Sequence, residues 1–186
     1  MLTSSAHRTG TDRVAEAARG LEADLVVNMQ GDEPLMDPRI VDQAVELLAN
    51  QTDLVMGTVA RQIRSVEDLY DPGVVKVVVD QWGFALYFSR SPIPFVRDVP
   101  KGPETLSRGA GHIFEHIGLY VYRPDFLQIF TTMEQTPLEQ LEKLEQLRAL
   151  ENGYRIRVAE TTYPSFKVDT PEDLERVRTL AEQQDA

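Results

Sequence analysis

Two carboxylates and an amide directly follow an apolar run in residues 26–36, VVNMQGDEPLM. Asp32 could hold Mg²⁺, because this ion takes oxygen ligands and keeps several of its waters. The alternative is that Asp32 and Glu33 only solvate a turn before Pro34. Taken alone, the local pattern favours the turn over the metal site.

A second carboxylate that could share a metal is Asp169, in the segment KVDTPEDLERV. It stands just before a predicted helix, which Thr170 caps and Pro171 opens, with Asp173 placed as a capping acid. Asp169 could therefore also be an acid held against the positive end of the helix dipole. The motif by itself slightly favours this second role.

Three histidine and tyrosine positions have spacings that could carry chemistry. His112 and His116 are four residues apart, which on a helix can suit zinc. His116, however, enters a strand-like segment and no HExxH pattern is present, so a zinc pair is not predicted. His116 and Tyr120 have even spacing and would face one side of a strand. They either line a pocket or pack as half-buried core residues.

Arg90 and Arg97 flank a proline-rich turn. Guanidinium groups bind carboxylates and phosphates with paired hydrogen bonds, although surface solvation explains most arginines. Glu145 and Gln146 are polar positions within a leucine-rich segment, and solvent exposure explains them adequately. None of these four residues indicates a site without further context.

Composition limits the function classes. The chain has 186 residues, 42% hydrophobic and 26% charged, as is typical of one globular domain. The absence of cysteine excludes disulfides, thiolate metal sites and a cysteine nucleophile, and it suits a cytoplasmic protein. A formal net charge of −11 disfavours nucleic-acid polymers as partners but not a small phosphate ester neutralised by Mg²⁺. No apolar run reaches the roughly 20 residues that span a membrane.

The elements that must position these residues follow from hydrophobic patterning and turn signals. Helices are predicted as a short one ending near Gly20, at 38–50, at 136–153 and from Pro171 onward. Strands are predicted at 24–29, 53–63, 74–80, 83–91, 116–123 and 155–161, with a hairpin turn at 80–83 and a loop at 91–111. This order predicts an α/β sheet, mainly parallel, with an antiparallel insertion. Ligands bind beyond the carboxyl ends of such strands, where QGDEP falls.

Taken together and in order, seven segments closely resemble the 3-deoxy-manno-octulosonate cytidylyltransferase (CMP-Kdo synthetase) family: GTDRVAE, VVNMQGDEP, VKVVVD, ALYFSRSPIPF, HIGLYVYR, PLEQLEKLEQLRALENG and VDTPEDLERVR. The match covers almost the whole chain. It implies a single domain over residues 1–186 with the Rossmann-like nucleotidyltransferase fold of nucleotide-diphospho-sugar transferases. It also implies the reaction of CTP with 3-deoxy-D-manno-octulosonate (Kdo) to give CMP-Kdo and pyrophosphate, with Mg²⁺, for lipopolysaccharide synthesis. A homodimer is the implied assembly.

The resemblance also implies roles for individual residues. Mg²⁺ would be held by the catalytic carboxylates Asp32 and Asp169, and arginines would hold the sugar carboxylate. The implied nucleotide-binding residues are Gly10, Thr11, Arg13, Gln30 and Asp32. The implied residues of the sugar-acid pocket are Gln30, Arg90, Arg97, His116, Tyr120, Glu145 and Gln146.

The sequence departs from the family pattern in two places. The family begins with a strand and a basic loop of the type RLPGKPL that cradles the CTP phosphates, and nothing like it occurs here. We therefore expect a chain truncated at the amino terminus, inactive and aggregation-prone alone, with an unpaired edge on the strand around Val26. Lys167 stands where the family usually has glycine, so the resemblance does not carry over the family's local backbone or its metal access at this position. The alternatives are a non-catalytic remnant or a cytidylyltransferase for another acidic sugar.

Overall fold

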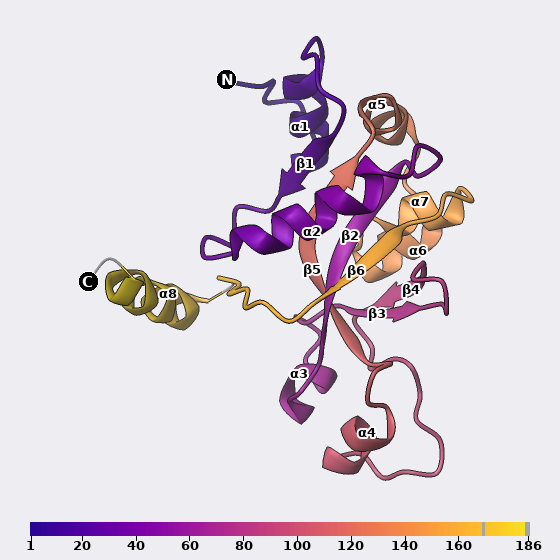
Figure 1. The fold of residues 1–186 in the computed structure, drawn as a ribbon, viewed down its shortest axis with the longest axis vertical. Helices are drawn as coiled ribbons and strands as arrows, with labels where there is room; N and C mark the ends of the chain where they lie inside the picture. The colour runs from indigo at the N-terminus through magenta and orange to yellow at the C-terminus, as the bar shows by residue number, and fades with distance from the viewer. Residues whose placement is uncertain (169, 185–186) are drawn as a thin grey trace.

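A computed structural model describes residues 1–168 and 170–184 (Figure 1). The helices are α1 (Gly10–Ala18), α2 (Pro38–Ala49), α3 (Val66–Tyr70), α4 (Pro103–Arg108), α5 (Pro124–Thr132), α6 (Pro137–Glu142), α7 (Leu147–Glu151) and α8 (Pro171–Gln184). The strands are β1 (Val26–Met29), β2 (Met56–Gln62), β3 (Lys76–Val79), β4 (Ala85–Ser89), β5 (Phe114–Tyr122) and β6 (Arg157–Thr161). None of the helices so described is both long enough and apolar enough to cross a membrane.

One sheet contains the strands in the order β4-β3-β5-β2-β6, with β1 paired to β5. The predicted α/β sheet and the hairpin between β3 and β4 are confirmed. The expectation of a mainly parallel sheet needs correction, because in the described residues only the β2–β6 ladder is parallel. β1, β2 and β3 do run in the same direction, but each pairs with β5, which runs against all three.

Two strands, β1 and β3, pair with the side of β5 that does not face β2, and they meet nearly end to end. β1 pairs with the carboxyl-terminal half of β5 and continues to Gln30, whose N–H donates to the Gly118 carbonyl at 3.2 Å. β3 pairs with the amino-terminal half, and the His116 N–H donates to the Val75 carbonyl at 2.8 Å. The carboxyl end of β1 therefore opens onto a short gap between the two strands.

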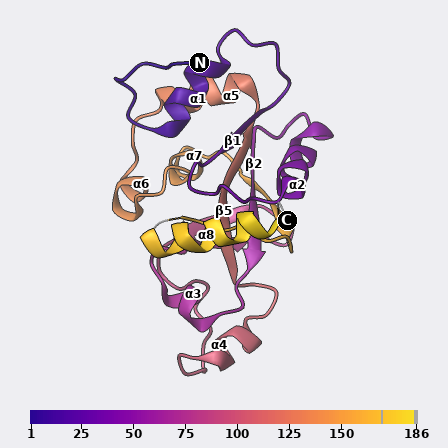
Figure 2. The same cartoon turned by 90° about the vertical axis from the view of Figure 1, so that its left-hand side faces the viewer.

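Helices cover both faces of the sheet, as Figure 2 shows with α2 on one side and α6 and α7 on the other. Side chains alternate along a strand, so odd positions of β5 face α2 and even positions face the opposite layer. Ile40, Ala44 and Leu48 of α2 recur every four residues and pack against the odd positions of β5. Phe126 and Phe130 of α5 belong to the core on the even side.

Some predicted helix boundaries are confirmed by their caps. Asp37 accepts a hydrogen bond from the Arg39 N–H at 3.0 Å at the start of α2. The Thr136 N–H donates to Glu139 Oε2 at 3.2 Å at the start of α6. Thr170 likewise accepts from the Asp173 N–H at 3.2 Å at the start of α8.

The predicted helix at 136–153 is wrong as one element. The structure has α6 and α7, separated at Lys143, which adopts the left-handed conformation with φ of 55°. A strict spacing of three residues drifts around a helix of 3.6 residues per turn, so one straight helix could not bury every leucine. Leu144 and Leu147 are buried whereas Leu141 is exposed. The predicted loop at 91–111 also contains α4, and α3 and α5 were not predicted.

Candidate functional site

A cavity of about 320 Å³ lies at the gap between β1 and β3. This volume is at the lower end of the usual range for small-molecule sites, roughly 300–1,000 Å³. The end of β1, the middle of β5 and the segment before α8 all contribute to its wall. Its polar lining residues are Gln30, Asp32, Glu33, Arg61, Asp71, Glu115, His116, Ser165, Lys167 and Asp173.

The loop after β1 separates its two carboxylates into different roles. Glu33 is buried and accepts hydrogen bonds from the Gly118 N–H at 2.8 Å and from the Ser165 hydroxyl. A Cβ at Gly118 would lie 3.0 Å from Glu33 Oε1, so glycine permits this close approach. Glu33 thus clamps the loop to β5, while the Asp32 side chain remains 38% exposed at the cavity.

The segment before α8 reaches the same loop. The Val168 N–H donates to the Asp32 carbonyl at 2.8 Å, and Lys167 Nζ lies 4.0 Å from Asp32 Oδ2. Asp169 lies outside the described residues, so its pairing with Asp32 stays a prediction. The described residues contain no cluster of three or more His, Asp or Glu suited to a metal. Mg²⁺ is usually held by one or two carboxylates plus substrate phosphates, so the exposed Asp32 carboxylate fits this ion.

His116 and Tyr120 face the same side of β5, as predicted. Their ring centroids lie 5.2 Å apart, and Phe88 meets His116 edge-on at 5.1 Å. His116 Nε2 is 2.9 Å from the hydroxyl of Thr58 on β2. Burial lowers the pKa of His116 to about 3, so the imidazole is neutral near pH 7. His116 lines the cavity and thereby brings one predicted sugar-pocket residue beside Gln30 and Asp32.

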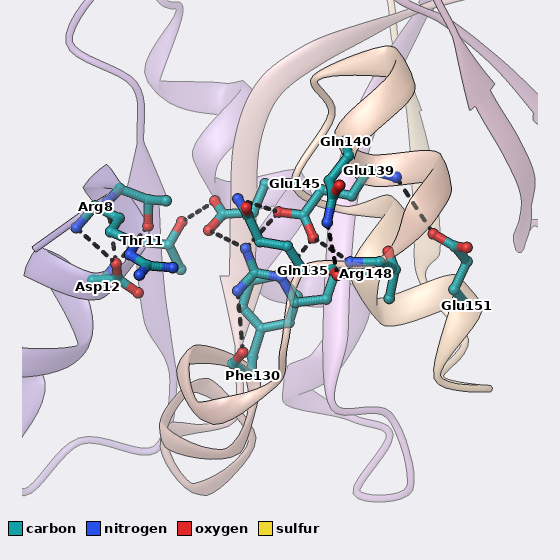
Figure 3. Close-up of polar contacts among 12 residues, drawn as sticks. Arg8, Thr11, Asp12, Phe130, Gln135, Glu139, Gln140, Glu145, Arg148 and Glu151 are labelled. Atoms are coloured by element: carbon teal, nitrogen blue, oxygen red, sulfur yellow. Dashed lines mark hydrogen bonds and ion pairs between the residues drawn. The ribbon is translucent and has the colours of Figure 1, made fainter.

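A buried polar network surrounds Glu145 (Figure 3). The Thr11 hydroxyl donates to Glu145 Oε2 at 2.7 Å and accepts from Asn28 Nδ2 at 3.1 Å. Arg148 forms a paired contact with Glu139, through Nε to Oε2 at 2.8 Å and Nη2 to Oε1 at 2.5 Å. Arg148 Nη2 also lies 3.6 Å from Glu145 Oε1. Burial raises the pKa of Glu145, and the Thr11 hydrogen bond opposes that rise.

The solvent exposure expected for Gln146 is wrong. Gln146 is buried, and within the described residues its Nε2 has no hydrogen-bond partner. Buried donors are nearly always satisfied by protein, water or a ligand. Gln146 is therefore the clearest sign of an external polar partner in this part of the fold. Burial raises the pKa of Tyr120, and the negative charge of Glu145 adds to that rise, which joins this region to the aromatic row on β5.

The two arginines predicted for the sugar acid are not among the cavity lining. Arg90 donates from Nε to the Glu142 carbonyl and from Nη1 to the Pro72 carbonyl, both at 2.8 Å. It thus joins the end of α6 to the loop before β3. Arg97 is 86% exposed and lies 3.4 Å from Asp98. Contact of either guanidinium with a sugar carboxylate stays a prediction.

The residues predicted for the cytidine side lie at the start of α1. Gly10 is the first helical residue, and Arg13 Nη1 donates to the Ser4 carbonyl at 3.0 Å. Thr11 is 1% exposed, and its hydroxyl is engaged by Glu145 and Asn28. Direct contact of these residues with a nucleotide also stays a prediction.

Sequence reasoning missed the cross-strand pair of Arg61 and Glu115 in the cavity wall. Their nearest nitrogen and oxygen are 2.5 Å apart, and burial raises the pKa of Glu115. The two residues are register partners between β2 and β5. An opposite-charge pair can be found in a sequence only when the strand register is known.

The geometry agrees with what comparisons with known proteins find. The cytidylyltransferase family matches residues 1–156. A 3-deoxy-manno-octulosonate cytidylyltransferase of Trichlorobacter lovleyi is 51% identical over 98% of this chain and 73% of its own length. The enzyme of the same name from Solibacter usitatus is 54% identical over 96% of this chain and 68% of its own length.

A solved structure of CMP:2-keto-3-deoxy-manno-octonic acid synthetase, complexed with CTP, superposes with a TM-score of 0.87. Its sequence is 38% identical, and the alignment covers 99% of this chain and 72% of that protein. The nucleotidyltransferase fold predicted from the sequence is thereby confirmed. With relatives more than half identical along nearly its whole length, the chain belongs to the 3-deoxy-manno-octulosonate cytidylyltransferase family.

Proposed function

We propose that this chain transfers CMP from CTP to 3-deoxy-manno-octulosonate and releases pyrophosphate. The names of its relatives and the CTP bound by its structural neighbour support this assignment. The observation that carries it is the clamped loop after β1, which presents the Asp32 carboxylate at a cavity while burying Glu33. An ordinary turn would leave both acids in solvent.

The reaction brings two anions together, because the anomeric hydroxyl of a sugar acid must attack the α-phosphate of CTP. Positioning and charge neutralisation therefore dominate catalysis, and no protein nucleophile is required. Asp32, with Asp169, would hold Mg²⁺, which supplies Lewis-acid charge stabilisation when bound. Lys167 adds a positive charge beside Asp32.

Recognition of the sugar falls to polar groups that protein partners leave available. Gln146 offers a buried amide donor, and Glu145 Oε1 has no hydrogen bond in the described structure, although the Arg148 guanidinium lies 3.6 Å from it. A site whose buried polar groups pair with substrate hydroxyls rejects analogues lacking them. This argument favours an acceptor substrate that carries several hydroxyl groups. Mg²⁺ dependence, a homodimer and a cytoplasmic location remain parts of the proposal.

The test is pyrophosphate release with CTP, the sugar acid and Mg²⁺, measured on the purified full-length protein that contains residues 1–186. Asp32→Asn keeps the shape but removes the charge, and we expect kcat to fall about 10²–10³-fold, as for other groups that stabilise transition-state charge. Asp24→Asn, at an exposed position, is the matched control and should retain activity. A loss below about twofold for Asp32→Asn would contradict the assignment. Faster turnover of a different acidic sugar would favour the alternative substrate.

A further inference from the structure

The hydrogen bonds of Thr58 determine which ring nitrogen of His116 carries the proton. Thr58 is fully buried, and its Oγ1 lies 2.6 Å from the Leu119 carbonyl and 2.9 Å from His116 Nε2. A carbonyl oxygen can only accept, so the single hydroxyl proton is donated to Leu119. The hydroxyl oxygen must then accept from His116, which requires a proton on Nε2.

This arrangement leaves Nδ1 of His116 as an acceptor. The ring is neutral, since burial lowers the pKa of His116 to about 3, and a neutral imidazole has one N–H. No hydrogen bond joins Nδ1 to another described residue, while the residue lines the cavity beside Asp32. Phe88 and Tyr120 contact the ring and limit its rotation.

We propose that Thr58 is a positioning residue that holds His116 in the Nε2–H tautomer, so that Nδ1 accepts a hydrogen bond from a hydroxyl of the sugar acid. The inference deepens the proposed function and rests on it. If the imidazole could switch tautomers, Nδ1 could pair with either a hydrogen-bond donor or a hydrogen-bond acceptor of the ligand. A ring fixed as an acceptor selects for a hydroxyl and discriminates against deoxy or ether analogues at that carbon.

The first test is the ¹⁵N NMR spectrum of histidine-labelled protein, which has only three histidines to assign. In the wild type we expect a protonated Nε2 and an unprotonated Nδ1 for His116. Thr58→Val removes the acceptor with little change in shape. The proton should then move toward Nδ1, because a buried N–H without a partner is costly. Thr58→Ser should restore the wild-type pattern.

Thr161→Val is the matched control, because Thr161 is a buried threonine on the neighbouring β6 whose hydroxyl accepts from the Tyr163 N–H. It should leave the His116 signals unchanged. A wild-type spectrum with the proton on Nδ1 would overturn the inference without any variant. The inference would also be overturned if the Nδ1 resonance of His116 did not move when the wild type is titrated with the sugar acid.

The second test separates the two substrates. Thr58→Val should raise KM for the sugar acid about tenfold, the equivalent of about 1.4 kcal/mol, and Thr58→Ser should recover most of it. KM for CTP should change less than twofold. Equal losses for both substrates would overturn the positioning role. Absence of cytidylyl transfer in the wild type would instead refute the proposed function, while the tautomer and titration experiments would still test Thr58.

Discussion

Removing the guanidinium of Arg148 should destabilise the fold far more than removing that of Arg178. The side chains of Arg148 and Glu139 are 4% and 5% exposed, and two hydrogen bonds join them. Arg148 also faces Glu145, as Figure 3 shows. Arg148→Met therefore leaves two carboxylates in a poorly solvated region without their cation.

The magnitude follows from this burial. Removing one partner of a buried ion pair costs about 3–5 kcal/mol, because the other charge stays uncompensated. We expect Arg148→Met near the upper end, since two carboxylates are affected. A typical total stability is about 5–15 kcal/mol, so the loss is a large fraction of it. The exposed pair of Arg178 and Glu175, 61% and 70% exposed, should lose at most about 1 kcal/mol in Arg178→Met.

The penalty should also depend on pH. Burial raises the pKa of Glu145, and the positive charge of Arg148 opposes that rise, so the pKa of Glu145 should rise further in Arg148→Met. An acid with a raised folded-state pKa stabilises the fold fully below its unfolded value of 4.5 and loses that contribution as pH rises. The deficit of Arg148→Met should therefore be larger near neutrality than near about pH 5.

Urea denaturation followed by far-ultraviolet circular dichroism measures these unfolding free energies directly. Wild type, Arg148→Met and Arg178→Met should be compared at both pH values. A loss in Arg148→Met no larger than that in Arg178→Met would refute the reasoning from burial. A pH-independent difference would refute the part that concerns Glu145.

Three further predictions concern single positions. Gly118→Ala places a Cβ 3.0 Å from Glu33 Oε1 and should cost about 1–3 kcal/mol; an unchanged thermal midpoint would contradict it. Because the pKa of His116 is lowered from 6.5 to about 3, its neutral ring stabilises the fold above about pH 6.5 and this contribution is lost on acidification. The stability of the wild type should therefore fall relative to His116→Gln below that pH, and parallel curves would disprove the shift. Thr9→Ala removes the cap that accepts from the Asp12 N–H at 3.1 Å and should cost about 0.5–2 kcal/mol, with Thr9→Ser close to wild type in denaturant melts.

Features that depend on neighbouring residues could be predicted from the sequence. The starts of α2 and α6 were predicted because the residues that pair with Asp37 and Thr136, Arg39 and Glu139, lie within three positions of them. The position of the break at Lys143 could not, because the drift of the leucine spacing argues against one straight helix but does not indicate where the helix ends. The buried pair of Glu139 and Arg148 joins α6 to α7 across this break, and no local pattern indicates it.

The same distinction between neighbouring and distant partners decides which residues of the candidate site could be predicted. Asp32 and His116 were predicted because they belong to recognisable segments, and both line the cavity. The burial of Glu33 cannot be predicted from the sequence, because its partners are distant: Gly118 is 85 residues away and Ser165 is 132. Thr58 resembles any threonine of a strand, and its role depends on the register between β2 and β5.

The central place of β5 has a consequence for how the chain acquires its structure on the ribosome. In the described fold, both strand partners of β2, which are β5 and β6, are synthesised after it. The hairpin of β3 and β4 can form before β5 is synthesised. The roughly 50 residues between β2 and β5 take about 3–10 s to translate at about 5–20 residues per second. During those seconds β2 lacks both of its strand partners, and we expect chaperones that bind at the exit tunnel to recognise its unburied residues.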